Sequence, residues 1–362
     1  MRYDIAIVGA GIAGASLAAA VAPHASVVVL EMEDSAGYHA TGRSAAFWSE
    51  TYGGPAIQPL TTASGAALQG GGFLQPLGSL QIGRVADAAR IDAFFREFDG
   101  QVPLRQVDPR EHVPGLRDDW TLAVFEPSCA YIDVAALHAD CLARAGRSGA
   151  ALRLNAPLDT AVYAGGAWRI EAGGETIVAT ILVDAAGAWG DDVAARSGVP
   201  SLGIRPYRRT MVQLRTEPEA PHGMPHVSQI DGELYFKPEA GGRLWLSPHD
   251  EVPADPGDAQ PEEIDVATAI YRFEQVVDWR VARVEHRWAG LRTFARDRLP
   301  VYGFDPVAPG FFWCAGQGGF GIQTAPAAAA LAASVLLGTA PDASVAAIDP
   351  GRYAPNRFRA LA

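Results

Sequence analysis

Positive charge is scarce in this sequence. Its 29 Lys and Arg residues face 41 Asp and Glu residues, which leaves a net charge of −12, and Lys237 is the single lysine. Binding to nucleic acid needs clustered cationic side chains that contact phosphates. The sequence therefore excludes a nucleic-acid partner, and it shows no basic amphipathic helix that could anchor the chain to a membrane.

Cysteine is also rare. The three cysteines are Cys129, Cys141 and Cys314, and they follow no CxxC or metal-ligand spacing. The eight histidines form no HExxH motif. An odd number of unpatterned cysteines is typical of reduced thiols in a cytosolic protein. We therefore expect free thiols, no metal site and a cytoplasmic location.

Long uncharged runs are few, and the one at residues 5–22 resembles a signal peptide or a membrane span at first sight. Asp4 stands before it in place of a basic segment, glycines interrupt it, and Pro23 follows it. A β-branched run comes next. We therefore expect this run to form folded secondary structure, without stable membrane insertion.

That same region carries a dinucleotide-binding fingerprint. A short β-rich strand, Tyr3–Val8, leads into a G-x-G-x-x-G turn and a helix that ends at Pro23. A second strand, Ser26–Leu30, then ends at the acidic residue Glu31. This order of strand, glycine turn, helix, strand and acid is specific, whereas a glycine turn alone is weak evidence.

Each part of the fingerprint has a physical role. Gly9 permits the tight turn, Gly11 lets the backbone approach a pyrophosphate, and Gly14 lets the helix pack closely on the sheet. The helix N-terminus presents N–H groups to the phosphates, and Glu31 accepts hydrogen bonds from the ribose. The fingerprint does not by itself distinguish NAD from FAD. The residues expected to bind the dinucleotide here are Gly9, Gly11, Ile12, Ala13, Gly14 and Glu31.

The polar loop at residues 37–46 favours FAD. Arg43 and Ser44 could bind a pyrophosphate, while the small Ala45 and Ala46 leave room for a flat ring system. The alternative is a surface loop in which Arg43 is only solvated.

Two later segments are also expected to contact the dinucleotide. The strand at 180–184 ends in Ala-Ala-Gly, and the strand Phe311–Ala315 leads into a glycine loop at 316–321. We predict a helix over 324–337, with Pro326 in its first turn. Its N-terminus could stabilise negative charge on a reduced flavin, or it could only pack in the core. The candidate residues are Ala186, Gly187, Trp189, Gly318, Gly321, Ile322, Gln323 and Thr324.

Five further blocks stand in a defined order: Gly37–Ala46, Pro206–Arg209, Leu234–Pro238, Trp288–Phe294 and Gln317–Thr324. With the fingerprint, they resemble the D-amino-acid oxidase superfamily of flavoenzymes over nearly the whole chain, and within it most closely the bacterial D-arginine dehydrogenases. The resemblance implies FAD as cofactor and oxidation of a free D-amino acid to an imino acid that water hydrolyses to a 2-oxo acid.

The expected fold class is α/β, with a Rossmann-type FAD-binding domain and an antiparallel-sheet α+β substrate domain. We assign residues 1–75, 131–204 and 293–362 to the FAD-binding domain. Residues 76–130 and 205–292 form the substrate domain, in which strand signals return. The chain of 362 residues, 49% of them hydrophobic, is long enough for two domains that share an interface.

The resemblance also implies a set of catalytic residues. Arg292 and Arg209 match positions that bind the substrate carboxylate, and a guanidinium can do so bidentately. Tyr52, on a mobile loop, and Tyr235 match two tyrosines over the active site. The carbonyl of Gly319 matches an acceptor for the substrate amine. Hydride passes from Cα to the flavin N5, so positioning supplies most of the rate.

These positions have plainer interpretations as well. Arg208 and Arg209 are adjacent on a strand and point in opposite directions, so one of them is only a surface charge. Tyr235 could be an ordinary strand aromatic. Arg292 lies in an apolar run, where an unpaired guanidinium would be costly, and a bound anion explains it better.

Two departures from the D-arginine enzymes bear on the substrate. Phe47 stands where they have histidine, and Ser79 aligns with the acid that binds the substrate guanidinium. A cationic side chain without that acid loses about 1.5–3 kcal/mol. We therefore expect a neutral or apolar D-amino acid. No cysteine lies in 288–298, where covalently flavinylated relatives carry theirs, so FAD is expected to be non-covalent.

Three functional hypotheses follow. The first is a D-amino-acid dehydrogenase or oxidase, with a quinone or oxygen as electron acceptor. The second is oxidation of a secondary amine such as sarcosine or proline, or of a 2-hydroxy acid, since carboxylate-binding arginines suit all of these. The third is flavin binding without turnover.

Overall fold

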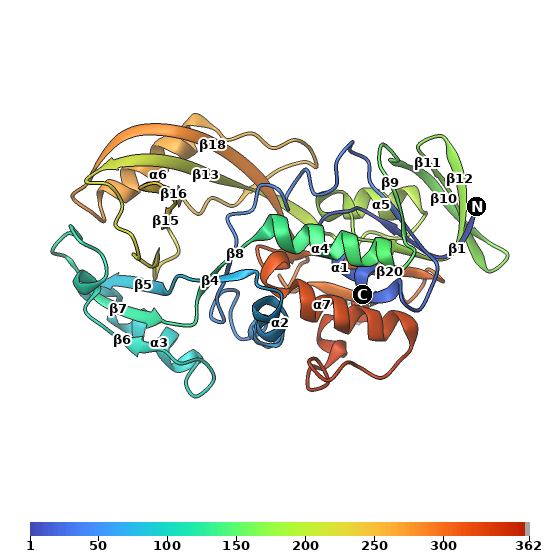
Figure 1. Cartoon of the computed structure of the whole chain (residues 1–362), viewed down its shortest axis with the longest axis horizontal. Helices are drawn as coiled ribbons and strands as arrows, with labels where there is room; N and C mark the ends of the chain where they lie inside the picture. The colour runs from blue at the N-terminus through green and yellow to red at the C-terminus, as the bar shows by residue number, and fades with distance from the viewer. Residues whose placement is uncertain (359–362) are drawn as a thin grey trace.

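The structure is a computed structural model that describes residues 1–358. Two sheet-based units lie side by side along the long axis of the molecule (Figure 1). The unit that contains the N-terminus carries a mainly parallel sheet. The other unit contains the two longest strands, β13 (Arg205–Glu217) and β18 (Arg280–Phe294), which reach towards the first unit (Figure 1).

The first sheet has parallel strands at its centre. β1 (Arg2–Val8) pairs with β12 (Glu175–Asp184) on one side and with β2 (Val27–Leu30) on the other. Strands of this kind are covered on both faces, which explains why β2 is apolar and buried throughout. The remaining strands of this sheet are β9 (Ala151–Arg153), β10 (Leu158–Ala164), β11 (Ala167–Ala172), β19 (Val301–Phe304) and β20 (Phe311–Ala315).

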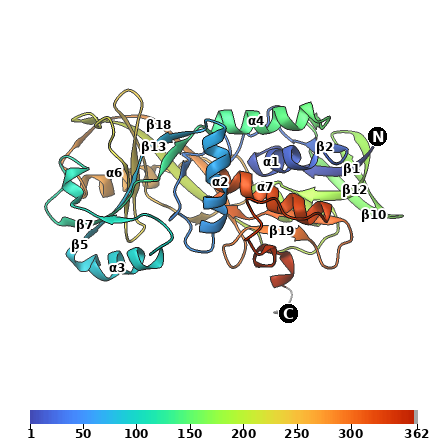
Figure 2. The same ribbon diagram turned by 60° about the horizontal axis from the view of Figure 1, so that its bottom comes forward.

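Helices cover both faces of this sheet. On one face, α1 (Ile12–Val21) packs between α4 (Val134–Arg147) and α7 (Gly321–Leu337) (Figure 2). α1 is apolar on all sides because it has neighbours on all sides. α2 (Gln58–Gly70) packs against α7, and α5 (Gly190–Arg196) contributes to the core on the opposite face. The first turn of α1 is thereby held at the carboxyl end of β1.

The C-terminal helix begins earlier than expected. The sequence predicts a helix over 324–337 with Pro326 in its first turn, but α7 begins at Gly321, so the proline lies inside the helix. Because proline has no N–H group, one helical hydrogen bond is lost there. The end of the expected glycine loop forms the first turn instead. Gly338 ends the helix in the left-handed conformation.

The second sheet is almost entirely antiparallel, and β18 and β13 run through it side by side. α6 (Glu263–Glu274) packs on these strands, and α3 (Ala88–Glu97) packs on β5 and β7. A small third sheet joins β3 (Phe47–Trp48), β8 (Ala130–Ile132) and β4 (Leu74–Pro76). The other strands of the second sheet are β5 (Ser79–Arg84), β6 (Arg105–Gln106), β7 (Trp120–Glu126), β14 (His226–Gln229), β15 (Tyr235–Glu239), β16 (Arg243–Ser247), β17 (Val252–Pro253) and β21 (Gln317–Gly318).

The predicted fold class is confirmed. The exact domain boundaries stay a proposal, and β18 crosses one of them: its last two residues, Thr293 and Phe294, pair with β21 within the segment 293–362 assigned to the FAD-binding domain, whereas its other residues belong to the substrate domain. In the described part of the chain, no helix combines the length and the apolar character needed to cross a membrane. All three cysteines are buried and free.

Candidate active site

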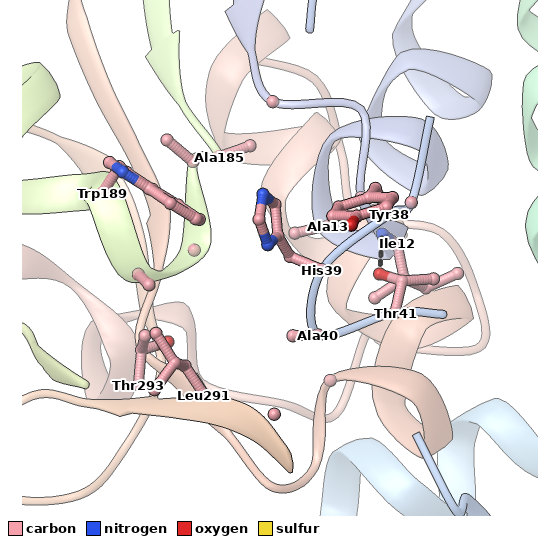
Figure 3. Close-up of a pocket in the computed structure, with 18 of the residues that line it drawn as sticks. Ile12, Ala13, Tyr38, His39, Ala40, Thr41, Ala185, Trp189, Leu291 and Thr293 are labelled. Atoms are coloured by element: carbon pink, nitrogen blue, oxygen red, sulfur yellow. Dashed lines mark hydrogen bonds between the residues drawn. The ribbon is translucent and has the colours of Figure 1, made fainter. Parts of the chain in front are cut away.

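A central cavity of about 340 Å³ lies where the two units meet. It is lined by the glycine loop, the first turn of α1, the loop at 37–45, the turn after β12, parts of β13 and β18, and the loop before α7 (Figure 3). These segments are far apart in the sequence. The predicted site residues that line it are Gly9, Gly11, Ile12, Ala13, Glu31, Arg43, Ser44, Ala45, Ala186, Gly187, Trp189, Arg209, Tyr235, Arg292, Gly318, Gly319, Gly321 and Ile322.

The glycine loop is packed so tightly that side chains are excluded. Gly9 has a φ of +101°, and a Cβ built on it would lie 2.5 Å from the carbonyl oxygen of Ala185. A Cβ on Gly14 would lie 1.9 Å from the carbonyl oxygen of Gly9. Gly14 therefore faces the loop and the sheet, and it does not line the cavity. This close packing holds the first turn of α1 against the cavity.

The first turn of α1 suits an anion. It contains no acidic residue, and its N–H groups lie at the positive end of the helix dipole. The amide of Ile12 donates to Thr41 Oγ1 at 3.0 Å, which joins the helix to the loop that covers it (Figure 3). Glu31 Oε2 accepts from the amide of Ala10 at 2.8 Å, so the acid lies beside the glycine loop.

Arg43 connects the two units. Its guanidinium donates to the carbonyl oxygens of Ala259 and Ala289, at 3.0 and 3.2 Å, and pairs with Asp258. Its own carbonyl accepts from Trp288 Nε1 at 2.9 Å. The predicted surface-loop alternative does not describe it, because the side chain lines the cavity and is largely enclosed.

Four predicted residues lie outside the cavity lining, in addition to Gly14. Ala46 lines a neighbouring cavity. Gln323 and Thr324 are buried, and the Thr324 hydroxyl donates to the carbonyl of Phe320. The Gln323 side chain bonds to the segment that carries the fourth residue, Tyr52. Gln323 and Thr324 therefore lie behind the lining, whereas the Tyr52 phenol lies beside Gly319.

The two adjacent arginines of β13 point in different directions. Arg208 binds Asp265 of α6 at 2.7 Å, away from the cavity. Arg209 lines the cavity, where its Nε donates to the carbonyl of Asp250 at 2.7 Å and its Nη2 to Glu251 at 3.3 Å. Its third nitrogen, Nη1, is buried without a partner. Burial, with the nearby positive charge of Arg292, lowers the pKa of Arg209.

Arg292 is the least neutralised cation of the site. No Asp or Glu of the described chain lies within 4.0 Å of its nitrogens. A Cβ built on Gly319 would lie 3.1 Å from Arg292 Nη1 and 2.5 Å from Tyr52 Oη. The guanidinium, the phenol and the Gly319 backbone therefore converge on one point. Burial acts to lower the pKa of Arg292, but Tyr52, Tyr235 and nearby acids outweigh it and raise the pKa.

An uncharged wall adjoins this point. The ring centroids of Phe47 and Tyr52 are 5.2 Å apart, and Phe47 also packs on His226 at 4.3 Å. His226 Nδ1 lies 3.1 Å from Ser79 Oγ, so the Ser79 position holds a buried neutral hydrogen bond. Tyr235, which lines the cavity, lies 5.6 Å from the His226 ring. Of these residues only Tyr235 lines the cavity, while Phe47, His226 and Ser79 pack behind it and supply aromatic and neutral polar groups.

Two histidines beside Tyr235, the buried His226 and the partly buried His249, make stability depend on pH. Burial lowers the pKa of His226 and of His249 to about 3, from an ordinary value of 6.5. Below pH 6.5 the unfolded chain binds protons that the folded chain excludes. We therefore expect the free energy of unfolding to fall as pH drops from about 6.5 towards 3, by at most ~1.4 kcal/mol per pH unit for each histidine.

Denaturant titrations at pH 7 and pH 4.5 measure this effect. H226Q should lose less stability between the two pH values than the unsubstituted protein. H24Q, which changes an exposed histidine, should behave like the unsubstituted protein. An equal loss in H226Q would contradict the assignment of His226 as a buried neutral group.

Comparison with known proteins agrees with this geometry. The model of the family described as FAD dependent oxidoreductase matches residues 4–335. This chain belongs to the FAD-dependent oxidoreductase family. The resemblance to the D-amino-acid oxidase superfamily is thereby confirmed, and the oxidoreductase uses FAD. The closer likeness to D-arginine dehydrogenases stays a prediction.

The alignments with individual relatives span almost the whole chain of the oxidoreductase. Glycine oxidase from Geobacillus kaustophilus is 25% identical to it over 92% of this chain and 93% of its own length. The structure of L-proline dehydrogenase from P. horikoshii has a TM-score of 0.86 at 20% identity, over 99% and 98% of the two chains. Iminodiacetate oxidase from Chelativorans sp. BNC1 has a TM-score of 0.77 at 24% identity, over 97% and 98%. At these identities, the two structures show the shared fold.

The residues of this oxidoreductase fit FAD. Gly9 and Gly11 form a cradle that leaves the anion-binding end of α1 open to the cavity, and none of the cysteines lines it. Other residues at or near the site could not be predicted from the sequence, because the local sequence around each of them is typical of a strand or loop without a functional role. Met211, His39 and Thr41 line the cavity and are among those that sequence reasoning missed. His226, His249 and Asp250 lie next to the lining residues Tyr235 and Arg209 and were also missed.

Proposed function

We propose that this protein oxidises a small free D-amino acid with a neutral or apolar side chain to the imino acid, which water hydrolyses to a 2-oxo acid. One observation carries the proposal. The Arg292 guanidinium lines the cavity without an acidic partner, beside Tyr52 and the Gly319 backbone. A partly buried cation without an acidic partner is stabilised by an anion, and the carboxylate of an amino acid supplies one.

The roles of the residues follow from their chemistry. Arg292 binds the carboxylate with two N–H groups, and the free Nη1 of Arg209 adds a further donor. The carbonyl of Gly319 accepts a hydrogen bond from the substrate amine, and Tyr235 and Tyr52 enclose the bound molecule. FAD, when bound, accepts the hydride that leaves Cα. These contacts work by orienting Cα, which accounts for a large share of the rate in such reactions.

The wall beside this point supports a neutral side chain. Ser79 and His226 bond to each other, and the depressed pKa of His226 keeps its ring uncharged at neutral pH. Phe47 covers them with an apolar face. A D-arginine side chain would find no carboxylate there, at a cost of about 1.5–3 kcal/mol. This supports small neutral or apolar substrates over cationic ones.

A second candidate is oxidation of a secondary amine, such as sarcosine or proline, or of a 2-hydroxy acid. Each of these also carries a carboxylate for Arg292. The fold shared with L-proline dehydrogenase and iminodiacetate oxidase favours this candidate. A cytoplasmic location, non-covalent FAD, and transfer of electrons to oxygen or a quinone are part of the proposal.

The test is anaerobic mixing of the purified yellow protein with D- and L-amino acids, N-methyl amino acids and 2-hydroxy acids, while the visible absorption of the flavin is followed. We expect fast bleaching by neutral D-amino acids and a weak response to D-arginine. Bleaching only by secondary amines or hydroxy acids would move the function to the second candidate. No bleaching at all would leave a flavin-binding protein without turnover and would refute the proposal.

A further inference from the structure

Glu126 holds the segment that precedes Tyr52. It is the last residue of β7, in the second sheet, and its side chain reaches across to residues 49–51 of the first unit. Oε2 accepts from Ser49 Oγ at 2.7 Å and from Thr51 Oγ1 at 2.6 Å. Oε1 accepts from the amide of Glu50 at 2.7 Å. Three consecutive residues thus donate to one carboxylate.

This arrangement is closed to water. Glu126 and Ser49 are each 2% exposed, and Glu50 and Thr51 are 7% and 6% exposed. Hydrogen bonds to an ionised group are about twice as strong as neutral ones, and a buried donor that loses its acceptor pays its full desolvation cost. The pKa of Glu126 is raised overall, because burial outweighs the lowering effect of the hydrogen bonds from Thr51, Ser49 and the Glu50 amide.

A second side chain holds the same segment from the opposite side. Gln323 of α7 accepts from the amide of Ser49 at 3.3 Å and donates to the carbonyl of Tyr52 at 3.0 Å. It also donates to Thr61 Oγ1 at 2.9 Å. The backbone before Tyr52 is therefore tied to α2, to α7 and to β7. The mobile loop implied by the family resemblance is anchored here up to the tyrosine.

The anchored segment ends at the site. The Tyr52 phenol lies beside Gly319, and its ring contacts Phe47 and Phe320 at centroid distances of 5.2 and 5.1 Å. Gly53 and Gly54 follow Tyr52 with positive φ values, so the chain after the tyrosine turns away. The position of the phenol thus depends on the anchor that comes before it.

We propose that Glu126 is a positioning residue that places the Tyr52 hydroxyl beside the substrate site, and thereby couples the sheet of the substrate unit to the geometry of the reaction. The idea rests on the proposed function, since it assumes that the phenol contacts the substrate. Glu126 touches neither the cavity nor its glycine loops. Its effect on catalysis acts through residues 49–52 alone.

The experiment combines hydrogen exchange with a double-mutant cycle. E126Q keeps the size of the side chain but replaces one acceptor oxygen by a donor group. T51V removes one hydroxyl donor at nearly constant shape, and serves if E126Q does not fold. The control is E285Q, because Glu285 also accepts from several donors, namely Arg215, Arg243 and Arg283 on the outer face of the second sheet.

In the FAD-loaded protein without substrate, amide exchange in a peptide covering 48–54 should accelerate in E126Q and T51V and stay unchanged in E285Q. This measurement needs no turnover, so it remains decisive for the anchor if the proposed function fails. With a substrate that bleaches the flavin, kcat/KM should fall by roughly tenfold in E126Q. In a Y52F background, the same substitution should lower kcat/KM by less than about twofold, because coupled residues are non-additive.

Three results would overturn the proposal. Unchanged exchange over 48–54 in both variants would show that Glu126 does not anchor the segment. An equal loss of kcat/KM in the Tyr52 and Y52F backgrounds would show that Glu126 acts by some route other than the phenol. Loss of bound FAD in E126Q, with a normal response in T51V, would assign Glu126 a structural role only.

Discussion

Replacing Arg292 by methionine is expected to abolish useful substrate binding while leaving FAD in place. Arg292 faces the cavity without an acidic partner, and its nearest neighbours there are Gly319 and the Tyr52 phenol. Removing one member of a buried charge pair costs about 2–5 kcal/mol, or roughly 30- to several-thousand-fold in affinity. The ligand-free protein should become slightly more stable, because a partly buried charge without an acidic partner is removed.

Substrate affinity comes from the dependence of the bleaching rate on substrate concentration, and stability from thermal unfolding of the ligand-free protein. R287M is the matched control. Arg287 lies on the same strand, β18, but its side chain is half exposed and pairs with Glu263 at the surface. R287M should change neither quantity appreciably. An R292M protein that binds substrate as tightly as the unsubstituted one would rule out the carboxylate site at Arg292.

Replacing Gly14 by alanine is expected to destroy FAD binding and to destabilise the FAD-binding unit. The added methyl carbon would lie 1.9 Å from the carbonyl oxygen of Gly9 and 3.3 Å from a methyl group of Ile7. Neither the backbone oxygen nor the buried strand β1 can move aside easily. α1 would have to shift away from the sheet, at a cost of about 1–3 kcal/mol or more, and its N-terminus would leave the cavity.

Flavin content per protein, read from the visible absorption after purification, and the thermal midpoint of the apoprotein measure this effect. The control is G146A in α4, since a Cβ there meets no atom within 4 Å. G146A should keep a full flavin complement and gain a little stability, because alanine is the better helix former. Full flavin content in G14A would contradict the close packing of the glycine loop.

Local patterns along the chain determined the FAD-binding unit. The order of strand, glycine turn, helix, strand and acid specifies a compact βαβ element, because each residue type favours its own local structure. Glycine permits the turn, β-branched residues favour the strands, and Glu31 binds the backbone of the adjacent glycine loop. Local patterns also located the two glycine loops of the cavity lining, whereas Arg209, Arg292 and Tyr235 were predicted from the family resemblance.

Predictions from local sequence patterns were less reliable where tertiary packing overrides the local preference. The start of α7 was placed three residues late, because Pro326 was taken as a first-turn residue. In the fold, Gly321 begins the helix, and α7 tolerates the missing hydrogen bond since it is packed against α1 and α2. Gln323 and Thr324, which are expected at the cofactor, are buried and do not line the cavity.

What only the tertiary structure decided is which polar side chains meet across the two units. Whether Arg208 or Arg209 faces the cavity depends on the orientation of β13. In the fold Arg209 faces the cavity, and Arg208 binds Asp265 of α6 on the other side. Glu126 lies 75 residues from Thr51 along the chain, and nothing in either local pattern indicates the bond between them. The sequence by itself therefore determined the family and the cofactor, and its family resemblance supplied Arg209 and Arg292 as candidates for binding the substrate carboxylate. The neutral wall at His226 and the anchor of Tyr52 arise from long-range packing, because such contacts depend on how separate elements are brought together.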